Sequence, residues 1–180
     1  MATIIAIAGA SKPNAYQRAV AFTVGQLVAQ RKAVVVCGGL GGVMDASARG
    51  VASIDNAISV GLLPGLDVAS SSPAITIPIT TGLGQVRNVV LVHACRAMIA
   101  IGGGYGTLSE IGFALRLRKP LALIDSWEFT HASTKEDPDP PRLFTAPRLG
   151  ARSMSDAERQ AHAVRSATAA VDWIFDQLGG

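Results

Sequence analysis

The sequence predicts an α/β protein: a single doubly wound, Rossmann-like domain with a parallel sheet and helices on both faces. Apolar runs of strand length alternate along the chain with segments of helical periodicity. These runs are rich in Val, Ile and Ala, a composition typical of parallel strands buried on both faces. The chain has 180 residues, of which 49% are hydrophobic and 16% charged. We therefore expect residues 1–180 to form one domain with a well-filled core.

The expected elements follow one another in βα order. The segment 15–30 is an amphipathic helix, because one of its faces carries Val20, Val24, Leu27 and Val28. The segment 57–63 ends at the turn formers Pro64 and Gly65. The expected strands are residues 4–8, 33–36, 57–63, 75–79, 97–101 and 121–124, and the expected helices are residues 15–30, 43–51, 85–95 and 108–117.

For two of these strands the sequence also indicates a position in the sheet or in the chain order. Residues 75–79 contain Pro78, which lacks a backbone N–H and therefore indicates an edge strand or a strand end. Residues 121–124 are the last strand that we expect. After them, residues 127–152 form a proline-rich, charged insertion that we expect to be exposed. It fits either a lid over a site or a surface loop without a function.

A final helix is expected after this insertion. Ser155 and Glu158 have the spacing of a capping box and would begin it. The apolar stripe of this helix, which we expect to pack on the core, consists of Trp173, Ile174 and Leu178.

A glycine-rich turn follows the expected strand at 97–101, and residues 101–110 read I-G-G-G-Y-G-T-L-S-E. Backbone N–H groups at a helix start, at the positive end of its dipole, bind phosphate and other anions. The turn also carries one hydroxyl and one carboxylate, Thr107 and Glu110. Two roles fit this pair equally: contact with a ligand, or a capping box that satisfies the first N–H groups of the helix.

A second loop of this kind spans residues 37–45 and reads C-G-G-L-G-G-V-M-D. Four glycines in five positions exceed what a turn needs, which favours close approach by a ligand. A third short loop, residues 9–11, follows the first strand. Since ligands bind at the carboxyl ends of parallel strands, we expect the three loops to converge there. Neither glycine loop has Walker A or G-x-G-x-x-G spacing, so the site does not resemble a standard ATPase or dehydrogenase site.

The charge distribution favours an anionic ligand. The net charge is +3, but ten Lys/Arg and four acids precede Asp125, which gives the glycine-loop half +6. No basic stripe with interleaved aromatic residues indicates nucleic-acid binding. No apolar run is long enough to cross a membrane, and no secretory signal or metal-ligand spacing is evident. We expect a cytoplasmic protein whose Cys37 and Cys95 are free thiols.

Together the loops resemble the LOG-like Rossmann proteins, a family whose members have been labelled lysine decarboxylases. The matching motifs are Gly38-Gly39-x-Gly41-Gly42-Val43-Met44 and Gly102-Gly103-Gly104-x-Gly106-Thr107-x-x-Glu110. The resemblance covers roughly residues 4–124. Within the family, the segment Thr80-Thr81-Gly82-Leu83-Gly84-x-x-Arg87-Asn88 is most similar to the branch that contains molybdenum-cofactor carrier proteins.

This resemblance implies two different activities. LOG enzymes hydrolyse the N-glycosidic bond of a nucleoside 5′-monophosphate, and their catalytic arginine and glutamate correspond to Arg87 and Glu110. A carboxylate can stabilise the cationic ribosyl centre and orient water. In the carrier proteins the same pocket holds the pterin phosphate and molybdate of the cofactor without hydrolysis. Ile101 and Asn88 depart from the enzyme pattern, so we expect a carrier or storage protein.

A phosphoribohydrolase and a nucleotide-sensing regulatory protein remain the alternatives. The bound molecule would be the molybdenum cofactor or a nucleoside monophosphate, and no cofactor is required as a catalyst. No pyridoxal lysine signature supports a lysine decarboxylase. The resemblance also implies a homodimer or homotetramer.

The expected site draws on all three loops. Arg87 and Glu110 would be catalytic only in a hydrolase. Structural roles also fit several positions: a surface ion pair for Arg87, a helix N-cap for Ser11, a strand end for Thr81 and a capping role for Asp45. We expect the ligand or its phosphate to be bound by Gly9, Ser11, Gly39, Gly41, Gly42, Thr81, Arg87, Gly103, Gly104, Tyr105, Gly106 and Thr107.

Overall fold

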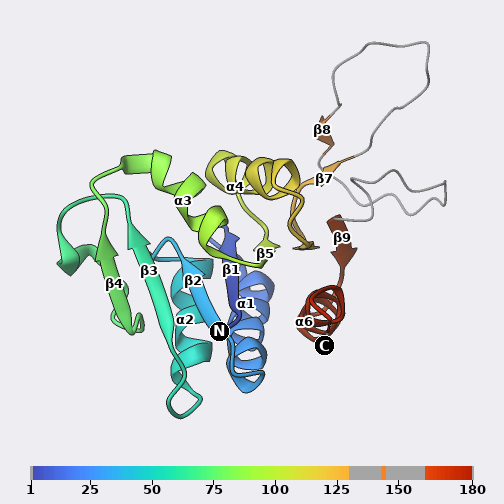
Figure 1. Ribbon diagram of the computed structural model, residues 1–180, viewed down its shortest axis with the longest axis horizontal. Helices are drawn as coiled ribbons and strands as arrows, with labels where there is room; N and C mark the ends of the chain where they lie inside the picture. The colour runs from blue at the N-terminus through green and yellow to red at the C-terminus, as the bar shows by residue number, and fades with distance from the viewer. Residues whose placement is uncertain (1, 130–142, 145–160, 180) are drawn as a thin grey trace.

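A computed structural model describes residues 2–129, 143–144 and 161–179. Seven parallel strands form one sheet in the order β4-β3-β2-β1-β5-β6-β9, with helices on both faces (Figure 1). The predicted doubly wound fold is therefore confirmed. In chain order the elements are β1 (Ile4–Gly9), α1 (Ala15–Gln30), β2 (Val34–Cys37), α2 (Val43–Ala52), β3 (Ser59–Leu63), the 3-10 helix η1 (Val68–Ser70), β4 (Ile77–Thr80), the 3-10 helix η2 (Gly84–Val86), α3 (Arg87–Ala94), β5 (Ala97–Ile101), α4 (Tyr105–Arg116), β6 (Leu121–Ile124), β7 (Glu128–Phe129), β8 (Leu143–Phe144), β9 (Ala161–Val164) and α6 (Ala167–Gln177).

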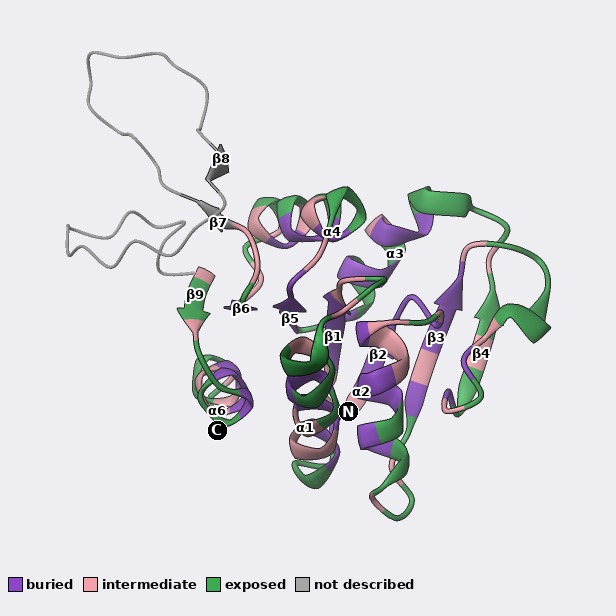
Figure 2. Ribbon diagram, turned by 180° about the vertical axis from the view of Figure 1, so that it is seen from behind, coloured by how far each residue is buried: buried purple, intermediate pink, exposed green. Residues whose placement is uncertain are grey.

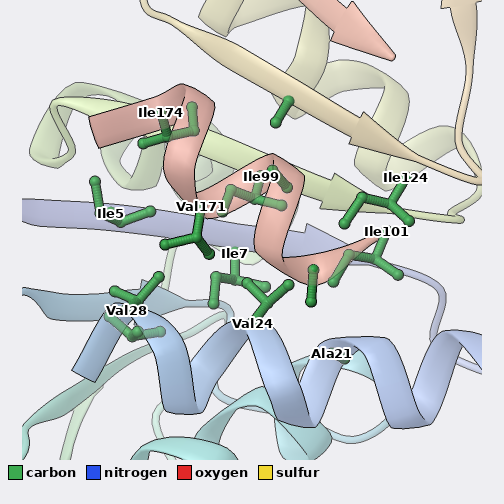
Figure 3. Close-up of a cluster of buried hydrophobic side chains, with 14 of the residues drawn as sticks. Ile5, Ile7, Ala21, Val24, Val28, Ile99, Ile101, Ile124, Val171 and Ile174 are labelled. Atoms are coloured by element: carbon green, nitrogen blue, oxygen red, sulfur yellow. The ribbon is translucent and has the colours of Figure 1, made fainter. Parts of the chain in front are cut away.

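The core consists of two apolar layers, one on each side of the sheet. Because side chains alternate along a strand, Ile5 and Ile7 of β1 face α1, α2 and α6, whereas Ala6 and Ala8 face α3 and α4. Figure 3 shows the first layer, in which α1 and α6 pack side by side over β1 and β5. Every residue of β5 is buried, as expected for a strand covered on both faces.

The C-terminal part differs from the prediction. Residues 121–124 are not the last strand, because β9 pairs with β6 in parallel, with Leu121 opposite Ala161. Helix α6 begins after Ser166, whose hydroxyl accepts a hydrogen bond from the backbone N–H of Ala169. Ser155 and Glu158, the predicted capping box, lie outside the described residues. Strand β9 has the sequence A-H-A-V, which is too short and too weakly apolar to predict a strand. Two of its four residues are exposed.

Most of the predicted insertion, residues 127–152, also lies outside the described residues. Within it, the two-residue strands β7 and β8 pair antiparallel, which was not predicted. No helix in the described part of the chain has the length and hydropathy that a membrane span requires.

Strand β4 is the open edge of the sheet, as Pro78 predicts, and it is largely exposed, whereas β1 and β5 are buried (Figure 2). The backbone N–H of Thr81 bonds the carbonyl of Leu63 on β3. Backbone groups alternate along a strand, so those of Ile77 and Ile79 also face β3. Those of Pro78 therefore face the open edge, where its missing N–H breaks no ladder bond.

Close packing of α1 on α2 depends on small residues. A Cβ on Gly50 would lie 1.9 Å from the carbonyl oxygen of Phe22 on α1. We expect Gly50→Ala to lower the free energy of unfolding by about 1–3 kcal/mol, because the two backbones must separate. Gly112→Ala in α4 is the control, since its Cβ would meet no atom within 4 Å. It should raise stability by about 0.5–1 kcal/mol through helix propensity. Urea titration of both variants checks this, and equal effects would contradict it.

Candidate functional site

Three loops meet at the carboxyl edge of the sheet, as predicted. The backbone N–H of Ala10, after β1, bonds the carbonyl of Ile101 at the end of β5 at 3.1 Å. The N–H of Val43, after β2, bonds the carbonyl of Ala10 at 3.0 Å. The site therefore lies where the chain leaves β1 toward one side and β5 toward the other, the switch point of a doubly wound sheet.

Most glycines in these loops are explained by contacts with the protein itself. A Cβ on Gly39 would lie 2.7 Å from the Leu63 side chain, and one on Gly42 would lie 2.4 Å from the carbonyl oxygen of Ala10. Gly39, Gly42 and Gly103 also have positive φ values, which favour glycine. Packing and backbone conformation therefore explain the glycines at these positions, and the number of glycines is not by itself evidence of a ligand there.

Three glycines do face open space. A Cβ on Gly41, Gly104 or Gly106 would meet nothing within 4 Å. None of the three has a positive φ, so the backbone conformation does not require glycine there either. Among the glycines that we predicted to contact the ligand, these three leave their backbone accessible to it, because no protein atom fills the space beside them.

Helices α2 and α4 begin at this edge without side-chain caps. Their N-caps are Gly42 and Gly104, which have no side chain to accept a bond from the first turn. Elsewhere, α1 and α6 are capped by the side chains of Asn14 and Ser166. Uncapped first-turn N–H groups at the positive end of a helix dipole are suited to bind an anion.

The alternative that Thr107 and Glu110 form a capping box is wrong. Helix α4 begins at Tyr105, three residues earlier than predicted, so both residues lie within the helix and are buried. The Thr107 side chain lies against Gly103, where a Cβ would approach it to 2.5 Å. Glu110 points instead toward α3.

Glu110 forms a buried ion pair with Arg87, the first residue of α3. The guanidinium Nη1 lies 3.2 Å from Glu110 Oε1, and Arg87 is only 5% exposed. This excludes the surface ion pair considered for Arg87. The guanidinium also lies against the first glycine loop, because a Cβ on Gly38 would be 2.3 Å from Arg87 Nη2. One buried pair therefore connects both glycine loops.

Asn88 and Ser109 support this pair, and we did not predict either as a site residue. The side-chain oxygen of Asn88 accepts a bond from Arg87 Nη1, and its Nδ2 donates to Ser109 Oγ at 2.8 Å. Nδ2 also lies 3.4 Å from the carbonyl oxygen of Gly106. Asn88 thus fixes the guanidinium relative to the first turn of α4. Arg87 Nε is buried and has no hydrogen-bond partner among the described residues.

Burial raises the pKa of Glu110 from 4.5 to about 7, and the neighbouring Arg87 only partly opposes this rise. The carboxyl group therefore exchanges its proton near neutral pH. Burial also raises the pKa of the Cys37 thiol to about 11, so this thiol stays protonated and is no nucleophile. Cys37 and Cys95 are free, as predicted, and both are buried.

The raised pKa of Glu110 predicts a pH-dependent stability. A folded-state pKa above the unfolded one contributes stability that is present below pH 4.5 and lost as pH rises through about 7. We expect the free energy of unfolding of the wild type, relative to Glu110→Gln, to fall by about 3 kcal/mol across this window. Urea titrations of both proteins at several pH values measure the difference. A difference that does not vary with pH would show that the pKa of Glu110 is the same in the folded and the unfolded protein.

The structure also shows which of the alternative structural roles apply to Ser11, Thr81 and Asp45. Ser11 is exposed and is not an N-cap, because Asn14 caps α1. Thr81 follows β4 directly and its hydroxyl donates to the carbonyl of Leu63 at 2.7 Å, as a strand end does. Asp45 does not cap α2 but pairs with Arg49 at 2.8 Å and accepts a bond from Ser72.

Tyr105 is the exposed aromatic residue among the predicted contacts. Its ring is 84% exposed at the start of α4 and stacks on Trp127, with centroids 6.3 Å apart. It lies between the open positions Gly104 and Gly106, so a flat ring is available beside the uncapped helix end. In the described residues, no three His, Cys, Asp or Glu side chains gather as a metal site requires.

Residues 2–148 match the SLOG cluster4 family. The chain belongs to this family. Its membership confirms the LOG-like Rossmann identity that the two glycine loops predict, near the carrier branch. A relative from Archaeoglobus fulgidus, described as an uncharacterized protein, is 42% identical over 118 residues, which are 66% of this chain and 77% of that protein.

Two solved structures extend the comparison. The molybdenum cofactor binding protein from the phototrophic bacterium Rippkaea orientalis has a TM-score of 0.78 and 25% identity to this SLOG chain. The match covers 99% of this chain and 98% of that one. The Moco carrier protein from Chlamydomonas reinhardtii has a TM-score of 0.75 at 24% identity over 99% of each chain, which shows a shared fold.

Proposed function

We propose that this protein binds a phosphorylated small molecule between residues 39–42 and 103–107, and that it carries or stores the molybdenum cofactor. The observation that carries the proposal is the pair of uncapped helix ends at α2 and α4, joined by the buried Arg87–Glu110 pair. A phosphate there would accept bonds from first-turn N–H groups other than that of Val43, which already bonds the carbonyl of Ala10, and experience the guanidinium charge.

Three further observations support a pterin phosphate as the ligand. Tyr105 offers an exposed ring on which a planar heterocycle can stack beside the phosphate position. The similarity to the Rippkaea orientalis protein, which binds the molybdenum cofactor, extends over nearly the whole chain. Molybdate and phosphate are both anions, which suits the +6 charge of the glycine-loop half.

Since both cysteines are buried and unpaired, we place the protein in the reducing cytoplasm.

Purification without oxygen, from cells that make the cofactor, tests this function. We expect molybdenum and a pterin to copurify with the wild type in equal amounts, as measured by elemental analysis and mass spectrometry. Gly106→Leu should lose at least about nine-tenths of both, because its side chain enters the open space at the start of α4. Gly112→Leu is the matched control in the same helix and should retain them. A copurifying nucleotide, or equal retention by both variants, would refute the proposal.

A phosphoribohydrolase remains the second candidate, and one observation favours it. The Glu110 carboxyl is buried, has a pKa of about 7 and touches a guanidinium, which are properties of a general acid–base group. The same pair can serve a carrier by holding the phosphate end of the cofactor. Catalysis therefore has to be tested by substitution of Glu110.

A further inference from the structure

The carboxylate of Asp125 lies at the carboxyl end of β6, beside the loop that follows β5. The backbone N–H of Gly102 bonds the carbonyl of Ile124 at 2.9 Å, and the hydroxyl of Ser126 donates to the carbonyl of Gly102 at 2.7 Å. Asp125 is therefore at the same edge of the sheet as the glycine loops. It is exposed, and we did not predict it as a site residue.

The backbone turns this carboxylate away from the side that the strand predicts. Leu121 and Leu123 face α3 and α4, so continued alternation would place Asp125 on that side too. Its side chain instead reaches α1, where Gln17 Nε2 donates to Oδ2 at 2.8 Å. Asp125 has a φ of 47°, which is uncommon outside glycine and is tolerated best by Asp and Asn.

Gln17 is itself fixed, so it presents a defined donor to Asp125. Its Oε1 accepts a hydrogen bond from the backbone N–H of Asn14 at 3.2 Å, as part of the capping box of α1. Its Nε2 is then the group that faces Asp125. Gly102 leaves room for this amide, because a Cβ there would lie 2.6 Å from Gln17 Nε2. Three elements that are distant in sequence therefore hold one exposed carboxylate in place.

This orientation leaves most acceptor sites of the carboxylate open. Two carboxylate oxygens can accept about four hydrogen bonds, and among the described residues only Gln17 donates one to the Asp125 side chain. The carboxylate can therefore bind two adjacent N–H donors of a ligand in bidentate fashion. Such a donor pair, a ring N–H beside an amino group, is the edge of a 2-amino-4-oxopyrimidine ring, which is the outer ring of a pterin.

Asp125 is also suitably placed for the end of the ligand that is remote from the phosphate. Strands β1, β5 and β6 are neighbours in that order, so the end of β6 is about 10 Å from the end of β1, where the glycine loops meet. A bicyclic ring with a short phosphorylated side chain spans a distance of this size. Tyr105, the ring on which the heterocycle can stack, lies near Asp125, because it stacks on Trp127. The negative charge of Asp125 repels a phosphate, so it also fixes which end of the ligand lies there.

We propose that Asp125 selects the ligand by its 2-amino-4-oxopyrimidine edge, accepting hydrogen bonds from the ring N–H and from the amino group. This inference rests on the proposed function, since it concerns the far end of the same ligand. Guanine carries the same edge as a pterin, so the experiment has to include both sources.

Titration calorimetry with two matched ligand pairs tests the proposal. The first pair is neopterin monophosphate and its lumazine counterpart, in which an oxo group replaces the 2-amino group; the second is GMP and IMP, which lacks that amino group. We expect the wild type to bind neopterin monophosphate at least about tenfold more tightly than the lumazine, whose oxo group would face the carboxylate.

Asp125→Asn should abolish this preference. Gln17 Nε2 would hold the amide oxygen of the new side chain, which turns its NH₂ group, a donor, toward the ligand. The melting temperature should not change, because Asn keeps the bond from Gln17 and tolerates a positive φ. Asp55→Asn is the control, since Asp55 is an exposed carboxylate that precedes β3 at the opposite edge of the sheet. It should keep the wild-type preference.

The outcomes distinguish this inference from the proposed function. Equal binding of both pterin ligands by the wild type, or an unchanged preference in Asp125→Asn, would overturn the role of Asp125 and leave the proposed function in place. A preference for GMP over IMP that Asp125→Asn abolishes, without any binding of the pterin pair, would support the role of Asp125 and refute the proposed function. If none of the four ligands binds, both are overturned.

Discussion

Replacing Arg87 with alanine is expected to lower the free energy of unfolding by about 3–5 kcal/mol at pH 8. The substitution removes a buried side chain and leaves the Glu110 carboxylate without its counter-ion. Because Arg87 opposes the rise in the pKa of Glu110, its loss should raise that pKa further. The loss of stability should therefore be smaller at pH 6, where Glu110 is already protonated.

Two further variants separate the buried charge from the lost volume. Arg49→Ala breaks an exposed ion pair with Asp45 and should lower the free energy of unfolding far less than Arg87→Ala does. Adding Glu110→Gln to Arg87→Ala removes the stranded carboxylate and should restore part of the stability at pH 8. Urea titrations provide all three values. If Arg87→Ala lowers the free energy of unfolding no more than Arg49→Ala does, the buried Arg87–Glu110 pair stabilises the fold no more than a surface ion pair.

Glu110→Gln is expected to separate the carrier from the enzyme. The carrier reading predicts that the wild type releases no free base from any nucleoside monophosphate, and that Glu110→Gln still copurifies with a pterin. A hydrolase would release base, and the variant would be slower by at least about a hundredfold, since an amide can neither transfer the proton nor stabilise a cationic ribosyl centre.

Chromatography of a panel of nucleoside monophosphates measures base release, and Gly112→Ala serves as the control that leaves the site intact. Below about pH 4.5 the Glu110 carboxyl is protonated in both the folded and the unfolded state, so Glu110→Gln should match the stability of the wild type only there. Urea titration at the assay pH shows whether both proteins are folded, and a difference in base release between two folded proteins reports on chemistry. Base release by the wild type that Glu110→Gln abolishes would replace the carrier proposal with hydrolysis.

Much of the fold could be predicted from the sequence because buried parallel strands leave a clear pattern. The strands β1, β2, β5 and β6 are nearly continuous apolar runs, and Pro78 marked the edge strand correctly. Strand β9 was missed because an edge strand of four small or polar residues has no such run. The start of α4 was placed late, because Gly104 and Gly106 do not look like helix formers and nothing in the sequence shows that Glu110 points to α3.

The site was predicted in outline and not in detail. The three loops and the residues Arg87 and Glu110 do lie together. The role of Asn88 was not visible, because its bonds reach residues about twenty positions away in sequence. Glycine count was also a poor guide. The sequence does not distinguish Gly39, which packs on β3, from Gly41, which is open.

The central claim is that an anion binds between the two glycine loops, and a crystal structure with inorganic phosphate or a nucleoside monophosphate tests it most directly. We predict density for the phosphate at the uncapped starts of α2 and α4, between residues 39–42 and 103–107 and on the side of Arg87. The result that would contradict the account is a phosphate bound elsewhere, with both loops unchanged and in contact only with protein.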